Sequence, residues 1–80
     1  MKRLGTISIF IENKDNVQRV NEILSQYGDI IISRMGIPYR EKQISIIVLI
    51  VDATNEEIGA LSGLIGNLKG VSVKTAIKKS

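Results

Sequence analysis

The stretch ISIFIENKDNVQRVNEILSQYGDIII, residues 7–32, matches VLIVDATNEEIGALSGLIGNLKGVSV, residues 48–73, when the first is shifted by 41 positions. Under this shift, apolar residues meet apolar residues in three separate blocks. The pairs are Ile7 with Val48 and Ile9 with Ile50; Val17, Val20, Ile23, Leu24 and Tyr27 with Ile58, Leu61, Leu64, Ile65 and Leu68; and Ile30 and Ile32 with Val71 and Val73. Each half therefore predicts a strand, an amphipathic helix and a second strand.

Local patterns place six elements along the chain. We expect strands at 4–11, 30–37, 43–51 and 71–77, and helices at 15–27 and 54–68. Thr54 followed three residues later by Glu57 is typical of a capping box at a helix start. Gly28 is expected to end the first helix in the left-handed conformation.

Two strand–helix–strand units joined by a hairpin predict an α+β fold, the ferredoxin-like βαββαβ sandwich. We expect residues 1–80 to form one domain, with a four-stranded antiparallel sheet in the order 4-1-3-2 and both helices on one face. The third strand, 43–51, is nearly continuous in apolar residues, as a central strand should be. Pro38 lacks the amide that a central strand donates, so the second strand is expected at an edge.

Period-two alternation then divides the strand residues between the two faces of the sheet. With the halves aligned at 41, the face under the helices is predicted to carry Ile7, Ile9, Ile11, Ile30, Ile32, Ile44, Ile46, Val48, Ile50, Val71 and Val73. The opposite, open face is predicted to carry large apolar residues at Phe10, Ile31, Met35, Ile47, Leu49 and Val51.

Such a patch exceeds what a monomer usually leaves in water. Burying roughly 500 Å² of it would contribute on the order of 10 kcal/mol before the costs of association. An 80-residue chain is marginally stable alone, so we expect a homodimer or homotetramer joined through this face. The alternative is that the apolar side chains are scattered over the surface.

Composition argues against catalysis and metal binding. The chain has no cysteine and no histidine, so thiol nucleophiles, thiolate metal sites and the commonest general base are excluded together. We expect neither enzymatic activity nor a cofactor. The acidic pair Glu56–Glu57 is read as a complement to the helix macrodipole.

The net charge of +3 is small, and its basic residues are scattered, which argues against nucleic acid as the partner. The longest apolar stretch, Ile44–Val51, is far shorter than the roughly 20 residues of a membrane span. No apolar signal segment is recognised in Leu4–Ile11, because polar residues interrupt it. A cytoplasmic protein without membrane contact is the expectation.

Two further features remain open from chemistry alone. Small residues at Gly59, Gly63 and Gly66 along the second helix either admit a close contact or merely weaken the helix. The hairpin is a candidate for contact with a partner protein or an anion, and its alternative is an edge turn kept soluble by charge. Its candidate contact residues are Arg34, Gly36, Pro38, Tyr39 and Arg40.

The run RMGIPYREKQISIIVLIVDATNEEIGALSGLIGNLKGVSVKTAI, residues 34–77, resembles the small ACT-like proteins described as regulators of the iron-only hydrogenase system. The hairpin RMGIPYRE and the segment EIGALSGLIGNLKGVSVK are its most specific parts. The resemblance implies an ACT-like regulatory domain and a role in hydrogenase expression or maturation. The C-terminal domain of nickel-responsive regulators has a similar fold, but its nickel site needs histidine and cysteine, which this chain lacks.

ACT domains of amino-acid metabolism bind effectors near the first strand–helix loop, at a subunit interface. By this analogy a small ligand would lie near Asn13, Asp15, Gly28 and Asp29, although the loop lacks the proline and glycine of the usual ACT turn. The leading hypothesis is therefore a non-enzymatic regulatory module that oligomerises and binds a small ligand or a partner protein. The alternative is a nucleic-acid-binding module that uses the open sheet face, where Phe10 could stack on a base.

Overall fold

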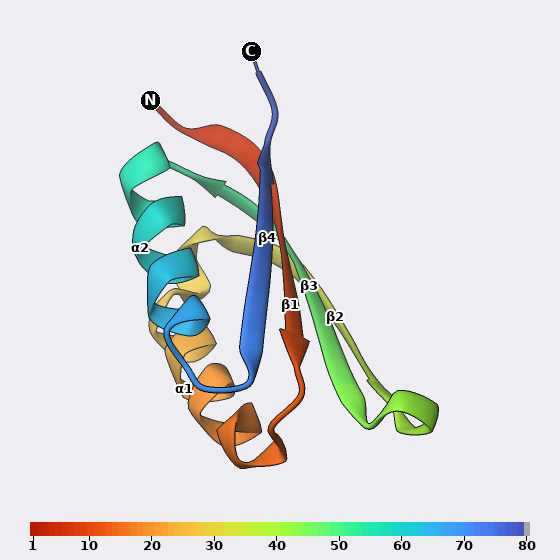
Figure 1. Cartoon of the computed structure of the whole chain (residues 1–80). Coiled ribbons are helices and arrows are strands. Elements are labelled where there is room, and N and C mark those ends of the chain that lie inside the picture. Colours follow the sequence, from red (N-terminus) through yellow and green to blue (C-terminus); the bar gives the residue numbers. More distant parts are fainter. Residues whose placement is uncertain (80) are drawn as a thin grey trace.

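The elements follow one another in the order β1–α1–β2–β3–α2–β4 in the computed structural model, which describes residues 1–79 (Figure 1). The strands are β1 (Arg3–Ile11), β2 (Ile31–Tyr39), β3 (Ile44–Ala53) and β4 (Val71–Ile77), and the helices are α1 (Val17–Gln26) and α2 (Asn55–Gly66). Short 3-10 turns occupy Lys14–Asn16, Gly28–Ile30 and Arg40–Lys42.

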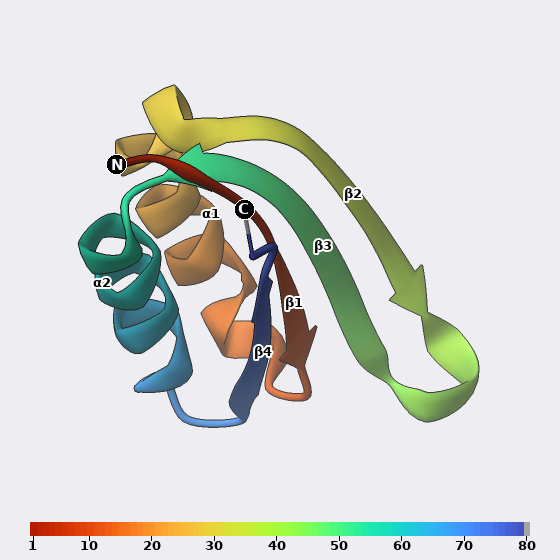
Figure 2. The same cartoon turned by 90° about the horizontal axis from the view of Figure 1, so that it is seen from above.

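The four strands form one antiparallel sheet in the order β2-β3-β1-β4, which confirms the predicted ferredoxin-like topology. Both helices lie on the same face of this sheet, and the other face is uncovered (Figure 1). The end of the β2–β3 hairpin projects past the rest of the sheet (Figure 2). As expected from Pro38, β2 is an edge strand, and β3 lies between β2 and β1.

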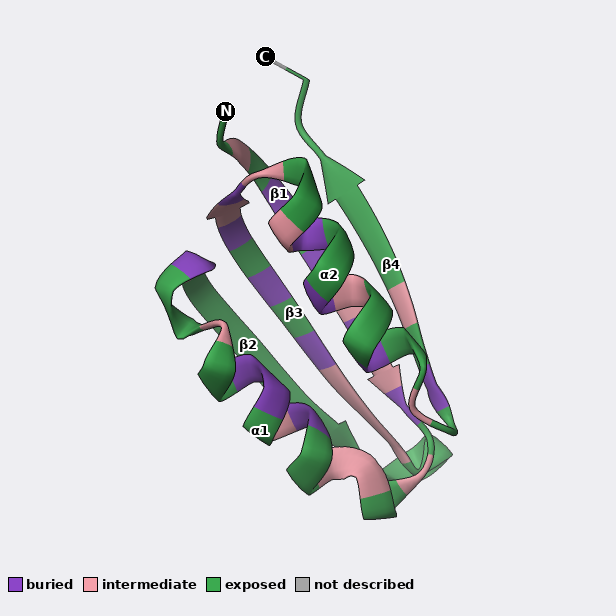
Figure 3. Ribbon diagram, turned by 90° about the vertical axis from the view of Figure 1, so that its left-hand side faces the viewer, coloured by how far each residue is buried: buried purple, intermediate pink, exposed green. Residues whose placement is uncertain are grey.

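The core fills the space between the sheet and the two helices (Figure 3). Helix α1 contributes Val20, Ile23 and Leu24, and helix α2 contributes Ile58, Leu61 and Ile65. The strand residues of the core are Ile7, Ile9, Ile11, Ile47, Leu49, Val51, Ala53 and Val71. No charged or polar side chain is buried among residues 1–79, so packing of aliphatic groups holds the domain together.

The faces predicted for β3 are wrong by one residue. Leu49 and Val51 are 0% exposed, and Ile47 is 6% exposed, so they lie under the helices rather than on the open face. The predicted core residues Val48 and Ile50 are instead 36% and 45% exposed. The pairing of β1 with β3 shows why, since the buried Ile7 stands opposite Leu49.

The error comes from the first strand–helix connection. Buried Ile7 corresponds to buried Leu49, a shift of 42, whereas buried Val20 corresponds to buried Leu61, a shift of 41. The connection that contains the turn Lys14–Asn16 is therefore one residue longer than its counterpart after β3. A single shift cannot align both the strands and the helices, and one residue of error exchanges the faces of a strand.

A β-bulge changes the faces at the start of β2. The register with β3 shifts between Ile31 and Ser33, so alternation is broken there. Ile31, predicted on the open face, packs partly buried against the core. Ile32, predicted under the helices, is 59% exposed.

The left-handed residues also differ from the prediction. Gly28 begins a 3-10 turn, and the positive φ angles in residues 1–79 belong to Gln43, at 54°, and Gly70, at 74°. A Cβ added to Gly70 would lie 2.6 Å from the Cβ of Asn13, so only glycine fits where the α2–β4 turn meets the β1–α1 connection. The Glu12 amide donates to the Gly70 carbonyl at 2.7 Å across the same contact.

The predicted capping box of α2 is present. The Thr54 hydroxyl accepts from the Glu57 amide at 3.1 Å, and Glu57 Oε1 accepts from the Thr54 amide at 2.9 Å. The Thr54 hydroxyl also donates to Glu57 Oε1 at 3.1 Å. The hydrogen bond from the Thr54 amide, and to a lesser extent that from its hydroxyl, lowers the pKa of Glu57 below its ordinary value of 4.5. The ionised carboxylate thus helps to hold the start of α2.

Our first prediction tests the corrected face assignment. Leu49→Ala should lower the free energy of unfolding by about 2–5 kcal/mol, because it leaves a cavity in the core. Ile50→Ala, at the next position but on the open face, should cost less than about 1 kcal/mol. Urea unfolding in dilute protein, where association does not contribute, measures both. Equal losses, or a larger loss at Ile50, would contradict the assignment.

The second prediction concerns the pH dependence of stability. Because the pKa of Glu57 is lower in the folded chain than in the unfolded chain, its contribution is complete above the ordinary value of 4.5 and is lost as pH falls through the lowered folded value. Glu57→Gln should therefore make the fall in unfolding free energy below pH 4.5 shallower. The matched control is Glu56→Gln, at the exposed neighbour, whose carboxylate is not the one bonded to Thr54. In denaturant titrations across this range, Glu57→Gln should change the slope more than the control does.

Candidate functional site

The uncovered face of the sheet is divided into an apolar half and a polar half. In the half formed by β2 and β3, Met35 is 69% exposed, Ile37 52% and Tyr39 40%. Val48 and Ile50 of β3 are also exposed, and Ile44 and Ile46 are half-buried. We call these seven residues the apolar half-face.

The polar half lies on β1 and β4. Register places Thr6 and Ser8 of β1 on the open face, beside Ala76 and Lys74 of β4. Phe10, opposite Ile46, is half-buried at the border between the halves. The open face therefore has two chemically different surfaces side by side.

Of the six residues predicted for the oligomer interface, the structure places Phe10 and Met35 on the open face. Ile47, Leu49 and Val51 lie in the core, and Ile31 packs against it. Sequence reasoning missed the exposed residues Ile37, Val48 and Ile50, and it assigned Tyr39 to the hairpin contact rather than to this surface. No signal in β3 itself could have assigned Val48 and Ile50 to this face, because both alternating sets of that strand are largely apolar.

The five hairpin residues predicted to contact a partner do not form one surface. Arg34 pairs with Leu49, and Gly36 pairs with Ile47, so both belong to the helix side of the sheet. The guanidinium of Arg34 donates to Asn21 Oδ1 at 2.8 Å, which ties the edge strand to α1. Arg34 therefore already has a structural partner.

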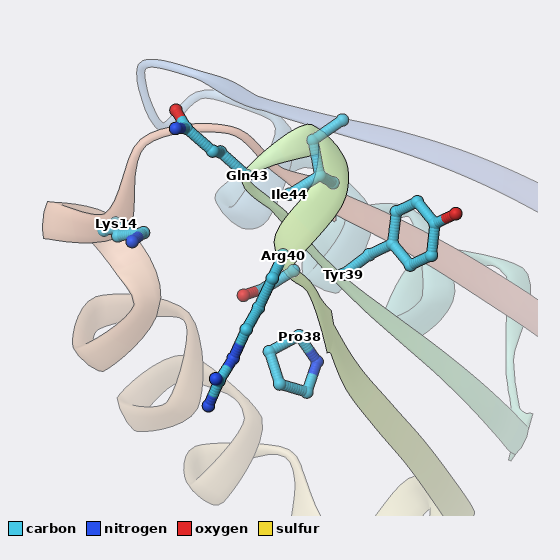
Figure 4. A pocket seen from close by; sticks show the side chains of 7 residues that line it. Lys14, Pro38, Tyr39, Arg40, Gln43 and Ile44 are labelled. Carbon is cyan, nitrogen blue, oxygen red and sulfur yellow. The ribbon is translucent and has the colours of Figure 1, made fainter.

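The remaining three hairpin residues, Pro38, Tyr39 and Arg40, lie at its end. Pro38 and Arg40 lie on the side of the hairpin that faces α1, whereas the ring of Tyr39 points away from the helix (Figure 4). The Tyr39 hydroxyl donates to Glu41 Oε2 at 3.2 Å.

A pocket of about 450 Å³ lies between this end of the hairpin and the β1–α1 connection (Figure 4). Its lining residues are Lys14, Pro38, Tyr39, Arg40, Gln43, Ile44 and Ser45. Ser45 stands opposite the buried Ile11, so the pocket opens on the helix side of the sheet. The pocket thus joins two segments that sequence reasoning treated as separate candidates.

The four residues predicted to bind a ligand lie at opposite ends of α1. Asn13 and Asp15 precede the helix, where Asn13 Oδ1 accepts from the Asp15 amide at 3.0 Å. Gly28 and Asp29 follow it, about 15 Å away for a helix of 10 residues. Within one chain, a small ligand cannot contact both pairs. Gly28 lines a shallow groove of about 350 Å³ beside Ile32 and Arg34.

The glycines of α2 face open space. A Cβ added at Gly59 or Gly63 would meet nothing within 4 Å, and one at Gly66 would touch only Val73, at 3.9 Å. No packing inside the described chain requires glycine at these positions.

Residues 1–79 lack two features that would suggest other functions. No group of three or more histidine, cysteine, aspartate or glutamate residues is placed to hold a metal ion there. No helix of that part of the chain has the length and apolar character needed to cross a membrane.

Comparison with known proteins gives a match over most of the chain. Residues 3–75 match the TM1266-like family, described as "Iron-only hydrogenase system regulator, putative". The structure of protein TM1266 from Thermotoga maritima is 38% identical, with a TM-score of 0.94 over 99% of this chain and 100% of that one. No curated protein matches.

More distant structures share the fold alone. The apo form of CPII from Thiomonas intermedia K12, a nitrogen regulatory PII-like protein, is 13% identical with a TM-score of 0.58, covering 100% of this chain and 97% of that one. The divalent ion tolerance protein CutA1 from Ehrlichia chaffeensis is 14% identical with a TM-score of 0.52, covering 100% and 85%.

Proposed function

Because the chain belongs to the TM1266-like family of iron-only hydrogenase system regulators, we propose that it is a non-enzymatic regulatory module that works as a homo-oligomer. Two copies associate through the apolar half-face, and the assembly responds to a small ligand or to a partner protein of the hydrogenase system. The observation that carries this proposal is the row of exposed apolar side chains on β2 and β3.

The apolar half-face has the chemistry of a protein interface. Met35, Ile37 and Ile50 are about half-exposed or more, and on β3 the charged residue of this face is Asp52, at the end of the strand beyond Ile50. Apolar patches of this size on a small domain usually mark a contact with another protein. A second copy supplies the same apolar patch, and a two-fold axis makes such a surface complementary to itself.

The area of the sheet is also consistent with a second copy of the chain as the partner. Four strands about 4.8 Å apart and up to about ten residues long give a face of roughly 600 Å² before the relief of the side chains is added. A stable interface buries about 800 Å² per partner. The apolar half-face covers two of these four strands, so it forms the centre of such a contact rather than its full extent. The aliphatic core of so short a chain gains stability from a second buried surface.

Regulation is expected to act through contacts rather than through chemistry or direct reading of DNA. The chain has no histidine or cysteine to serve as base or nucleophile. Both helices pack on the sheet in residues 1–79, so neither is free to enter a DNA groove. The alternative, nucleic-acid binding by the open face, has less support, because Lys74 is the only basic strand residue whose register places it there. The cytoplasmic location stays a prediction.

The test of this proposal is the mass of the protein in solution. Ile37→Lys places a charge on the apolar half-face at a position that is 52% exposed in the single chain, so the fold should tolerate it. We expect the wild-type protein to sediment as a dimer or larger at micromolar concentration and the variant to sediment as a monomer.

The matched control is Ala76→Lys, which adds the same charge to the polar half of the same face, on β4, with β1 between it and the apolar half-face. Its mass should equal that of the wild type. A monomeric wild type would refute association through the sheet, and an Ile37→Lys variant with unchanged mass would move the interface elsewhere.

A further inference from the structure

The pocket between the hairpin and the β1–α1 connection has the dimensions of a ligand site. Its volume of about 450 Å³ is within the range of roughly 300–1,000 Å³ that small-molecule sites occupy. It is built by two segments 26 positions apart in the sequence, since Lys14 comes from the turn before α1 and Arg40 from the end of the hairpin.

The charges around this pocket have one sign. Lys14 and Arg40 line it, and none of its other lining residues carries a carboxylate. Glu41, the neighbour of Arg40, accepts the Tyr39 hydroxyl at 3.2 Å. Residues 1–79 contain one ion pair, between Arg19 and Glu22 at 3.4 Å, so within that range neither basic group of the pocket is neutralised by an acidic one.

The polar groups of the pocket are also unengaged. Gln43 and Ser45 also line the pocket, although the Gln43 amide and the Arg40 guanidinium extend from the hairpin in opposite directions (Figure 4). No side-chain hydrogen bond recorded within residues 1–79 involves Lys14, Arg40, Gln43 or Ser45. The Lys14 ammonium and the Arg40 guanidinium are thus free to donate hydrogen bonds to an oxyanion, and a guanidinium can donate two in parallel.

An apolar surface completes the pocket. The ring of Pro38 lies between Arg40 and the strand and supplies this surface, whereas Ile44 points away from it (Figure 4). A bare inorganic anion would leave this surface in water, whereas the carbon skeleton of an organic anion would cover it.

We propose that this pocket binds a small organic anion carrying a phosphate or carboxylate group, held between Lys14 and Arg40 with its carbon skeleton against Pro38. This inference rests on the proposed regulatory function and names the chemical class of its ligand. The site differs from the one expected by analogy with ACT domains, since it uses Lys14 and the hairpin rather than Gly28 and Asp29. All seven lining residues come from one chain, so the site is complete without a second copy.

The test is calorimetric titration of the full chain at low salt with three probes, ribose 5-phosphate, citrate and inorganic phosphate. We expect at least one of the two organic anions to bind with a Kd below roughly 1 mM, and inorganic phosphate to bind at least about tenfold more weakly. A preference for ribose 5-phosphate assigns the recognised group as phosphate, and a preference for citrate assigns it as carboxylate.

Variants locate the binding in the pocket. Lys14→Ala and Arg40→Ala should each weaken binding by about tenfold or more, as expected for the loss of a charge-assisted hydrogen bond. Arg40→Lys should keep part of the affinity, since it keeps the charge but not the paired donors. The control Lys74→Ala, which removes the same charge from the open face, should bind as the wild type does.

Three results would overturn the inference. They are the absence of binding by every probe, unchanged binding by the Lys14→Ala and Arg40→Ala variants, and an equal loss in Lys74→Ala, which would show attraction to overall charge only. Circular dichroism verifies that each variant is folded. The same anions are also titrated into the Ile37→Lys variant. If that variant is monomeric and still binds, the pocket is supported independently of the proposed oligomer.

Discussion

The antiparallel pairing of β1 with β3 determines which side chains enter the core. Ile7 stands opposite Leu49 and Ile9 opposite Ile47, and all four are buried between the sheet and the helices. If this pairing slipped by one residue, the exposed Val48 would turn inward and Leu49 would turn to water. The core, the open face and the side on which the pocket opens all depend on this register.

Much of the fold follows from local signals. Pro38 predicts an edge strand, Thr54 and Glu57 predict the start of α2, and the stepping of apolar residues predicts both helices; the structure confirms each. These signals succeed because each depends on one backbone group or on one helical period. The faces of β3 fail because Ile46, Ile47, Val48, Leu49, Ile50 and Val51 are apolar without interruption, so alternation carries no information there.

The pocket could not be predicted from the sequence for a different reason. Lys14 is surrounded by Asn13 and Asp15 and has the character of an ordinary solvated charge, and so does Arg40 beside Glu41. Only the pairing of the hairpin with the rest of the sheet brings the two basic groups to one cavity. Part of the apolar half-face was predictable, since Met35 lies in β2, which Pro38 marks as an edge strand. The exposure of Val48 and Ile50 could be assigned only once the register between β1 and β3 was known.

Because side chains alternate along the hairpin strands, one side of the hairpin lines the pocket and the other side belongs to the apolar half-face. Pro38 and Ser45 face the pocket side, and Ile37 and Ile46, each one position along the same strand, face the apolar half-face. Inserting a single residue into either hairpin strand would move the residues on one side of the insertion to the opposite face of the sheet. Inserting two residues would leave every side chain on its present face. Among related chains, length differences inside these strands should therefore come in even numbers, and odd ones should be confined to the turn Arg40–Lys42.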